Sequence, residues 1–268
     1  MTRLERYGPW ALVTGASDGI GRATALRLAA EGFNVILAAR REPELRRLAA
    51  EIEDTHGVQT RVVAVDLAQP NGAGTLADAA AELDIGLAVL AAGFGSTGAF
   101  AEAPLDEELA MIAVNITAVA QLCHGLAGRM TSRGRGGIVL FGSILGWQGV
   151  AGQANYAATK AYVQSFAEGL HAELAPHGVD VLAVAPGPVH TGFAARAGLA
   201  MPSATTPEVV AGAVVKALGR RVTVVPGARA KLLTSALRVL PRRLRTRILT
   251  GVMAGMRADS TVVSATRK

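Results

Sequence analysis

The sequence predicts an α/β fold in which one doubly wound domain holds a seven-stranded parallel sheet with helices on both faces. Seven short apolar, β-branched segments recur along the 268 residues, and the longer segments between them carry apolar residues at the helical spacings of three and four. Strands that are buried on both faces and separated by helices form a parallel sheet, because parallel strands need crossover connections. Hydrophobic residues make up 50% of the chain and charged residues 18%, which allows a large buried core and excludes a disordered chain.

Each expected strand is separated from the next by a helical or turn-rich segment. The strands are Trp10 to Thr14, Asn34 to Ala39, Arg61 to Asp66, Leu87 to Ala92, Gly137 to Gly142, Val179 to Ala185 and Val222 to Pro226. No Pro/Ser-rich linker and no change in composition interrupts residues 1–227. We therefore expect one domain over residues 1–227 and a basic amphipathic C-terminal extension over residues 228–268.

The net charge of +6 is unevenly distributed. From Lys216 onward there are 13 Lys and Arg residues against one acid, whereas residues 1–215 carry 14 against 20. The basic character therefore belongs to the C-terminal part, where it suits an anionic surface or keeps the chain dissolved. Aromatic residues make up only 4% and no DNA-reading helix motif accompanies the charge, so no nucleic-acid partner is expected. A single cysteine excludes an intrachain disulfide and a multi-cysteine site, and no metal is expected.

Two segments bear on the location of the protein. Met1 to Trp10 lacks the apolar core of a secretory signal, which predicts a cytoplasmic protein. The stretch from Leu109 to Gly128 contains no charged residue and is long enough to span a membrane. It includes Asn115, Gln121 and His124, which hydrocarbon would penalise, so we interpret it as a helix buried in the core.

A glycine-rich turn follows the first strand and precedes a helical segment. The sequence from Thr14 to Gly21 has the spacing Gly-x3-Gly-x-Gly. Such glycines allow the backbone to approach a pyrophosphate, which the N-terminus of the helix binds through its free N–H groups. The second strand ends at Arg40, which suits the 2′-phosphate of NADP, and the third ends at Asp66, which suits adenine. We expect a dinucleotide site here; the alternatives are a purely structural turn and a solvated arginine.

Tyr156 and Lys160 lie four residues apart in Ala154 to Leu174, a segment with a helical pattern, so both side chains leave the same helix face. Ser143 ends the fifth expected strand, thirteen residues before the tyrosine. A phenol with a pKa near 10 is a poor acid or base at pH 7 unless a nearby cation favours its ionised form. Lys160 could supply that cation. A Tyr-x3-Lys spacing alone is more often a helix tyrosine beside a surface lysine, and the full constellation reverses that expectation.

Together with the glycine-rich turn and Asn115, these three residues make the chain resemble the short-chain dehydrogenase/reductase family over residues 9–227. The resemblance implies a Rossmann-type domain that binds NADP(H). It also implies that Tyr156 is the general acid/base, that Lys160 holds the ribose and lowers the pKa of the tyrosine, and that Ser143 orients the substrate carbonyl. Asn115 is similar to the family residue that holds the active-site helix and a proton-relay water.

The resemblance also implies a set of cofactor-binding residues in the turn, at the ends of strands and in the loop after the sixth strand. They are Gly15, Ser17, Asp18, Gly19, Ile20, Gly21, Arg40, Asp66, Leu67, Ala92, Gly93, Tyr156, Lys160, Pro186, Gly187, Val189 and Thr191.

The chain departs from the family pattern in two places. Leu90 and Ala91 stand where the family usually has two asparagines, which removes two amides that brace the central sheet. Asp18 stands where many NADP-binding members carry a basic residue, so the preference for NADP depends mainly on Arg40. The turn with Asp18 and the long basic tail most resemble a subgroup that contains fatty-acyl and steroid carbonyl reductases.

An apolar substrate pocket is expected beside the tyrosine. No charged residue occurs from Phe94 to Ala101 or from Gly136 to Thr159. The candidate lining residues are Phe94, Leu145, Trp147, Phe193 and Met201. The alternative is that two or three of them belong to the ordinary core.

The C-terminal extension has the pattern of a basic amphipathic helix that is interrupted at Pro241. Its apolar stripe consists of Leu233, Leu237, Leu240, Leu244 and Ile248, and its basic stripe consists of Lys231, Arg238, Arg242 and Arg245. Such a helix suits peripheral contact with an anionic membrane. It equally suits a lid or dimer helix that packs its apolar stripe on the domain.

These observations predict an NADP(H)-dependent oxidoreductase that interconverts a carbonyl and a secondary alcohol on an apolar substrate, either acyl-, steroid- or lipid-like. A homodimer or homotetramer is expected. Two alternatives of other classes are a cofactor-binding regulator with weak catalysis and a membrane-surface interaction protein.

Overall fold

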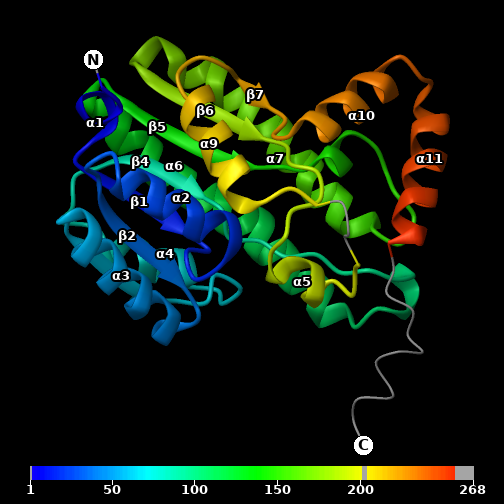
Figure 1. Ribbon diagram of the computed structural model, residues 1–268, viewed down its shortest axis with the longest axis horizontal. Helices are drawn as coiled ribbons and strands as arrows, with labels where there is room; N and C mark the ends of the chain where they lie inside the picture. The colour runs from blue at the N-terminus through cyan, green and yellow to red at the C-terminus, as the bar shows by residue number, and fades with distance from the viewer. Residues whose placement is uncertain (1, 201–203, 257–268) are drawn as a thin grey trace, which may run out of the picture.

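The computed structural model describes residues 2–200 and 204–256 and contains one parallel sheet in the strand order β3-β2-β1-β4-β5-β6-β7 (Figure 1). The strands are β1 (Trp10–Thr14), β2 (Asn34–Ala39), β3 (Thr60–Ala64), β4 (Ile85–Leu90), β5 (Gly136–Phe141), β6 (Val179–Val184) and β7 (Thr223–Val224). The predicted seven-stranded parallel sheet is confirmed. The first two strands have the predicted bounds, and the seventh is shorter than predicted.

Helices cover both faces of the sheet, as predicted. One face carries α4 (Gly72–Ala79), α6 (Ala118–Arg133) and α7 (Ala154–Leu174), and the other carries α2 (Gly19–Ala29), α3 (Glu42–His56) and α9 (Pro207–Ala217). The helix α5 (Leu105–Ile112) packs against α7, and its Met111 joins a third core cluster that includes Tyr156. Because side chains alternate along a strand, Leu12 of β1 joins the core under α6 and α7, and Val13 joins the core under α2 and α3. The sheet is therefore apolar on both faces.

The direction of winding reverses between β1 and β4, which are neighbours in the sheet although β2 and β3 lie between them in the sequence. Thr14 pairs with Leu90 at the carboxyl ends of these two strands. A parallel sheet opens a crevice at such a point, because the following segments leave toward opposite faces. The fold thereby defines where a ligand site is expected.

The apolar stretch predicted to be a buried helix forms one helical run from Leu105 to Arg133, in which a π-helical turn, Ala113–Thr117, joins α5 to α6. By length and composition this run could cross a membrane, and 44% of its most apolar window is buried. One face of α6 packs into the core through Leu122 and Leu126, among others. Cys123 lies on the same face, and burial raises the pKa of its thiol to about 12, so it fills the core.

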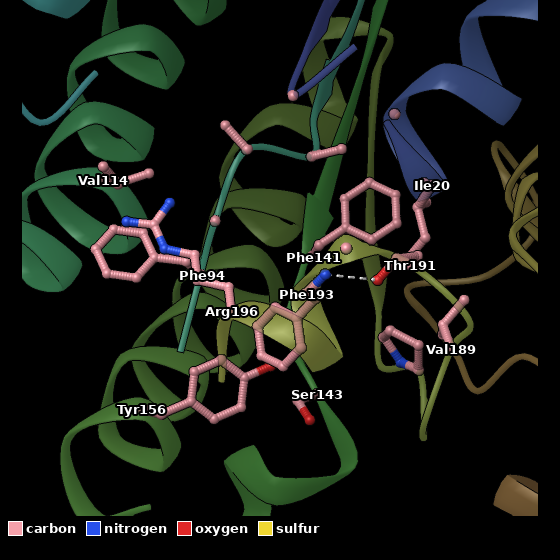
Figure 2. A pocket seen from close by; sticks show the side chains of 18 of the residues that line it. Ile20, Phe94, Val114, Phe141, Ser143, Tyr156, Val189, Thr191, Phe193 and Arg196 are labelled. Atoms are coloured by element: carbon pink, nitrogen blue, oxygen red, sulfur yellow. Dashed lines mark hydrogen bonds between the residues drawn. The ribbon is translucent and has the colours of Figure 1, made fainter. Parts of the chain in front are cut away.

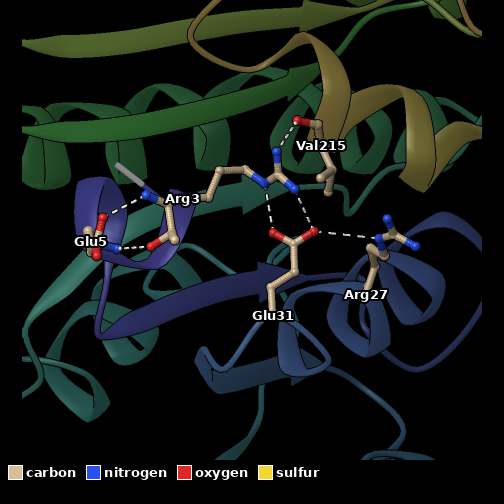
Figure 3. Close-up of polar contacts among 6 residues, drawn as sticks. Arg3, Glu5, Arg27, Glu31 and Val215 are labelled. Atoms are coloured by element: carbon tan, nitrogen blue, oxygen red, sulfur yellow. Dashed lines mark hydrogen bonds and ion pairs between the residues drawn. The ribbon is translucent and has the colours of Figure 1, made fainter.

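The N-terminal helix α1 (Arg3–Tyr7) lies at the opposite edge of the sheet from the crevice, before the start of β1. Arg3 makes two hydrogen bonds of 2.7 and 2.8 Å with the carboxylate of Glu31 and a third of 3.3 Å with the carbonyl oxygen of Val215 (Figure 3). Tyr7 donates a hydrogen bond of 2.6 Å to Asp180. These contacts tie the N-terminus to the domain without involving the crevice.

The last two helices of the described residues, α10 (Ala228–Arg238) and α11 (Arg242–Gly255), form an arm at one end of the molecule (Figure 1). The predicted interruption is confirmed, since Pro241 is the N-cap of α11. The predicted apolar stripe is wrong beyond Pro241: Leu244 and Ile248 are 42% and 36% exposed, whereas Leu249 and Met253 are buried. The break changes the direction of the helix, so the apolar spacing does not continue across it.

Candidate active site

A cavity of about 760 Å³ occupies the crevice at the carboxyl edge of the sheet. Its floor includes the glycine-rich turn between β1 and α2. Gly15 has a φ of +67°, and a Cβ on Gly15 would lie 3.0 Å from the backbone of Ala92. A Cβ on Gly21 would lie 2.3 Å from the carbonyl oxygen of Gly15. The glycines therefore permit the close packing that leaves the N-terminus of α2 open to a ligand.

Asp18 is the N-cap of α2 and connects the turn to the loop after β6. Its Oδ1 accepts a hydrogen bond of 2.7 Å from the N–H of Gly19, and its Oδ2 accepts one of 3.0 Å from the N–H of Gly192. A carboxylate is favoured at a helix N-terminus by the helix dipole. The acid that departs from the family pattern therefore has a structural role at this position.

Two arginines, Arg40 and Arg41, line the cavity beside the turn. The Arg41 guanidinium donates hydrogen bonds to Ser17, of 3.3 Å to its carbonyl oxygen and 3.1 Å to its hydroxyl. The position of Arg40 at the strand end predicted it alone as the phosphate ligand, although Arg41 follows it directly. Within a strand, neighbouring side chains point to opposite faces, so Arg40 and Arg41 would point apart. β2 ends at Ala39, so this alternation does not apply to them and Arg41 also faces the turn. The two guanidinium groups give this part of the cavity a positive charge.

Tyr156 and Lys160 lie one turn apart on α7, and Ser143 lies two residues after the end of β5, as the N-cap of the turn Ile144–Trp147. All three side chains are buried and line the cavity. The Lys160 ammonium donates a hydrogen bond of 2.8 Å to the carbonyl oxygen of Phe141 and lies 5.7 Å from the centre of the Tyr156 ring. Figure 2 shows Ser143 on the same side of the cavity as the Tyr156 ring.

Burial determines the charge state of this group. It raises the pKa of Tyr156 to about 12, and the hydrogen bond with Ser143 lowers the pKa by less. Burial also lowers the pKa of Lys160 to about 8. Among the protein's own groups, the loss of hydration outweighs the other effects on the pKa of Tyr156. The lowering by Lys160 together with an oxidised nicotinamide stays a prediction. The phenol is held in its protonated form, which is the form that can donate a proton.

Asn115 lies in the π-helical turn and is 1% exposed. Its Oδ1 accepts from the N–H of Phe94 at 3.2 Å, and its Nδ2 donates to the carbonyl oxygen of Phe94 at 2.9 Å and to the hydroxyl of Thr159 at 3.0 Å. Thr159 in turn donates to the carbonyl oxygen of Tyr156 at 2.8 Å. Asn115 therefore stands behind the cavity wall and fixes the segment after β4 relative to α7.

The predicted cofactor residues lie together. All of those expected at the turn, the strand ends and the loop after β6 line the same cavity. Asp66 also accepts a hydrogen bond of 3.0 Å from the N–H of Ala68. Leu90 and Ala91 stand where the family usually has two asparagines. Beside them, the hydroxyl of Thr14 accepts a hydrogen bond of 3.0 Å from the N–H of Ala92, and this bond joins the ends of β1 and β4.

The predicted substrate residues are only partly brought together. Phe94, Leu145 and Phe193 line the cavity, and the Phe193 ring lies 5.5 Å from that of Tyr156 (Figure 2). Trp147 does not line this cavity and instead lines a smaller cavity beside it. Leu145 and Trp147 would share one face of a strand, because they are two residues apart. In the helical turn Ile144–Trp147 their side chains point in different directions. Met201 lies outside the described residues.

Two features of the substrate side were not predicted. The wall opposite the catalytic group comes from the C-terminal arm, and its residues are Leu233, Leu249, Val252, Met253 and Met256. The guanidinium of Arg196 lies 4.0 Å from the centre of the Phe94 ring and places a charge at the border of the cavity (Figure 2). The helical pattern indicated which arm residues are apolar but not which of them face the site.

Polar residues next to the catalytic group were also missed. Gln153 lines the cavity, is 4% exposed, and its Nε2 has no hydrogen-bond partner. Glu108 is buried and accepts hydrogen bonds of 2.6 Å from Ser96 and 2.7 Å from Asn155, the residue before Tyr156. A glutamine in a helix-start segment carries no specific sequence signal, so only the structure identifies its free donor.

The comparisons with known proteins agree with this geometry. The short chain dehydrogenase family model matches residues 9–201. A 7beta-hydroxysteroid dehydrogenase of Collinsella aerofaciens is 32% identical over 238 residues, which cover 86% of this chain and 90% of that protein. A very-long-chain 3-oxoacyl-CoA reductase of Phaeosphaeria nodorum is 37% identical over 193 residues, which cover 68% of this chain and 56% of that protein.

Among solved structures, a short-chain dehydrogenase from Sphingobium yanoikuyae in complex with NADPH matches with a TM-score of 0.80 at 30% identity, over 94% of this chain and 98% of that one. A doubly wound sheet with this glycine-rich turn at its switch point is typical of a dinucleotide-binding domain, and the family model and the named relatives make the class an oxidoreductase. The chain belongs to the short chain dehydrogenase family.

Proposed function

We propose that the protein is an NADP(H)-dependent carbonyl reductase for apolar substrates, with Tyr156 as its general acid. Interconversion of CH–OH and C=O groups is the chemistry named for its relatives. One observation carries the proposal: a single cavity joins the glycine-rich turn and its two arginines to a buried, protonated tyrosine and an apolar wall. Cofactor, proton donor and apolar substrate can therefore meet in one place.

The cofactor side of the cavity fits NADP(H). The open N-terminus of α2 suits the pyrophosphate, and Arg40 and Arg41 suit a 2′-phosphate, because guanidinium groups bind phosphate through paired, charge-assisted hydrogen bonds. When bound, the nicotinamide supplies the hydride. The remaining work, which is to bind, to orient and to move a proton, belongs to the residues of the chain.

In the proposed reduction, Ser143 and Tyr156 hold the carbonyl oxygen of the substrate by hydrogen bonds. Tyr156 donates its phenolic proton as the oxygen gains negative charge. Below a pH of about 8 the Lys160 ammonium is charged, so it favours the phenolate that remains. Asn115 keeps α7 and the segment after β4 in register, which preserves the geometry of this group.

The cavity supports a large apolar substrate with a further oxygen near the reacting carbonyl. Phe94, Leu145, Phe193 and the arm residues supply the apolar wall. The free Nε2 of Gln153 lies one turn before Tyr156 and gives the wall a donor that needs an acceptor. A 3-oxoacyl thioester has a second carbonyl at a suitable position, and a hydroxysteroid has a larger rigid body. Both substrate classes agree with the relatives' names.

A panel of ketones assayed with NADPH tests this proposal. It includes simple ketones of increasing chain length, 3-oxoacyl thioesters of matched length, and 7-oxosteroids, each ranked by kcat/KM. We expect each buried methylene to contribute up to about 0.8 kcal/mol until the cavity is filled, and 3-oxo compounds to exceed simple ketones of equal length. A preference for short charged substrates would contradict the apolar site. Absence of turnover with every compound would favour a cofactor-binding regulator.

Assembly as a homodimer or homotetramer is a further proposal. The cytoplasmic location and the peripheral membrane contact are also proposals, the latter suggested by exposed apolar residues on the arm, Leu232 and Val239 among them. Light scattering measures the assembly. Sedimentation with anionic vesicles measures the membrane contact.

A further inference from the structure

A second cavity, of about 250 Å³, adjoins the reaction cavity between the turn Ile144–Trp147 and the two helices of the C-terminal arm. Three residues, Ile144, Leu233 and Leu249, line both cavities, so the two spaces share an apolar wall. The remaining lining residues are Trp147, Gln148, Thr234, Leu237, Arg238, Arg242 and Arg245. The second cavity lies on the substrate side and does not include the glycine-rich turn.

Three arginines line this small space. Arg238 comes from α10, and Arg242 and Arg245 come from the first turn of α11. Within residues 2–200 and 204–256, none of the three has a carboxylate within ion-pair distance. The Arg238 guanidinium lies over the Trp147 ring, 5.5 Å from its centre. The second cavity is therefore positively charged and has no acidic group of its own to balance it.

Two buried polar atoms at the same place have no hydrogen-bond partner among the described residues. They are the hydroxyl oxygen of Thr234, a residue that is 5% exposed, and Nε of Arg245. Nearly all buried polar groups in proteins are paired, because an unpaired donor in the interior costs about 1–3 kcal/mol. Both atoms can donate a hydrogen bond. A single acceptor placed in the cavity could therefore receive hydrogen bonds from both residues.

We propose that the second cavity binds an anionic group, a carboxylate or a phosphate, carried by the substrate. The body of the substrate lies in the reaction cavity. Its charged end extends past Ile144, Leu233 and Leu249, which line both cavities, and enters the second cavity. Arginines bind both anions through paired hydrogen bonds, and the Thr234 hydroxyl donates one more. The proposal that the anion belongs to the substrate rests on the proposed function. The proposal that the second cavity binds an anion does not.

The anion site is tested by fluorescence without turnover. The chain has two tryptophans, so Trp10→Phe leaves Trp147, which lines the cavity, as the reporter. In this background we expect decanoate and inorganic phosphate each to change the Trp147 emission saturably, and decan-1-ol not to. Arg242→Gln should weaken decanoate binding about tenfold. Arg243→Gln removes the same charge from a neighbouring exposed position that does not line the cavity, and it should leave the affinity unchanged.

The substrate role is tested by comparing a long-chain ketone that ends in a carboxylate with its methyl ester. We expect kcat/KM to favour the carboxylate about tenfold, and Arg242→Gln to abolish that preference while Arg243→Gln retains it. Equal effects of the two variants, or no saturable emission change, would overturn the anion site. Binding to phosphatidylglycerol vesicles alone, with no response to decanoate or phosphate, would assign the charge to a membrane surface and overturn it too. If no ketone is reduced, the proposed function fails while the fluorescence result stands.

Discussion

Replacement of Lys160 is expected to affect the activity of the protein and its stability in different ways. The ammonium group is buried beside the cavity and its one hydrogen bond goes to the carbonyl oxygen of Phe141. Burial lowers its pKa from 10.5 to about 8, so the folded protein bears a cost for keeping this charge at neutral pH. Replacing Lys160 by methionine keeps a long side chain and removes the charge. We expect the variant to lose activity without losing stability.

The size of the effect follows from the pKa. A lowering from 10.5 to about 8 corresponds to about 3 kcal/mol of destabilisation while the lysine is charged in both the folded and unfolded chains. The Phe141 carbonyl that loses its partner costs about 1–3 kcal/mol. At pH 7 the Lys160→Met variant should therefore have a free energy of unfolding equal to that of the wild type, or up to about 2 kcal/mol higher.

The dependence of the free energy of unfolding on pH gives a more specific test. Between about pH 8 and 10.5 the folded lysine has lost its proton while the unfolded lysine keeps it, so the stability of the wild type rises with pH through this range. Lys160→Met should lack this rise of about 3 kcal/mol. Urea unfolding at pH 7, 8, 9 and 10, with Lys216→Met as the control at an exposed lysine, measures the difference. Parallel stability curves for wild type and Lys160→Met would refute the reasoning.

Three further predictions concern the site. Tyr156→Phe should lower kcat by about 10²–10⁴-fold and leave the NADPH dissociation constant unchanged, because the phenol moves a proton and is not needed to hold the cofactor. A Tyr156→Phe variant that keeps most of its rate would contradict the role of Tyr156 as the acid. The wild type should prefer NADPH to NADH at least about tenfold in kcat/KM, and Arg40→Asp should reverse the order, which steady-state assays with both cofactors measure. Asn115→Ala removes three buried hydrogen bonds and should lower the free energy of unfolding by about 2–4 kcal/mol in urea titrations; a loss below 1 kcal/mol would show that the network does not hold α7 in place.

The sheet and the polar residues of the site were predictable because their signals are local. The strands β1 and β2 have the bounds that their apolar runs indicate, and α7 begins and ends where its helical pattern does. Tyr156, Lys160 and Ser143 meet because the helix spacing and the end of a parallel strand bring them to one edge. In each case a short stretch of sequence determines the position of the residue.

Side-chain directions outside regular elements were not predictable. Trp147 lies in a single helical turn, whose rotation sends it to the second cavity, and Arg41 lies past the end of β2, where alternation stops. On α11 the apolar residues that face the site are Leu249 and Met253, since Pro241 resets the helix direction. These outcomes depend on tertiary packing, which spacing in the sequence does not describe.

The C-terminal arm has a consequence for how this protein can change over time. Its buried residues Leu237, Leu249 and Met253 pack against the domain. Two hydrogen bonds also hold it, one of 3.1 Å from the N–H of Ala151 to Thr250 and one of 2.8 Å from the N–H of Ala200 to the carbonyl oxygen of Met256. The family model matches residues 9–201, which include Ser143, Tyr156 and Lys160, whereas the arm residues that line the cavity lie outside that match. Substitutions in the arm therefore change the wall of the cavity without replacing Ser143, Tyr156 or Lys160, so we expect substrate preference to change more readily than the reaction itself.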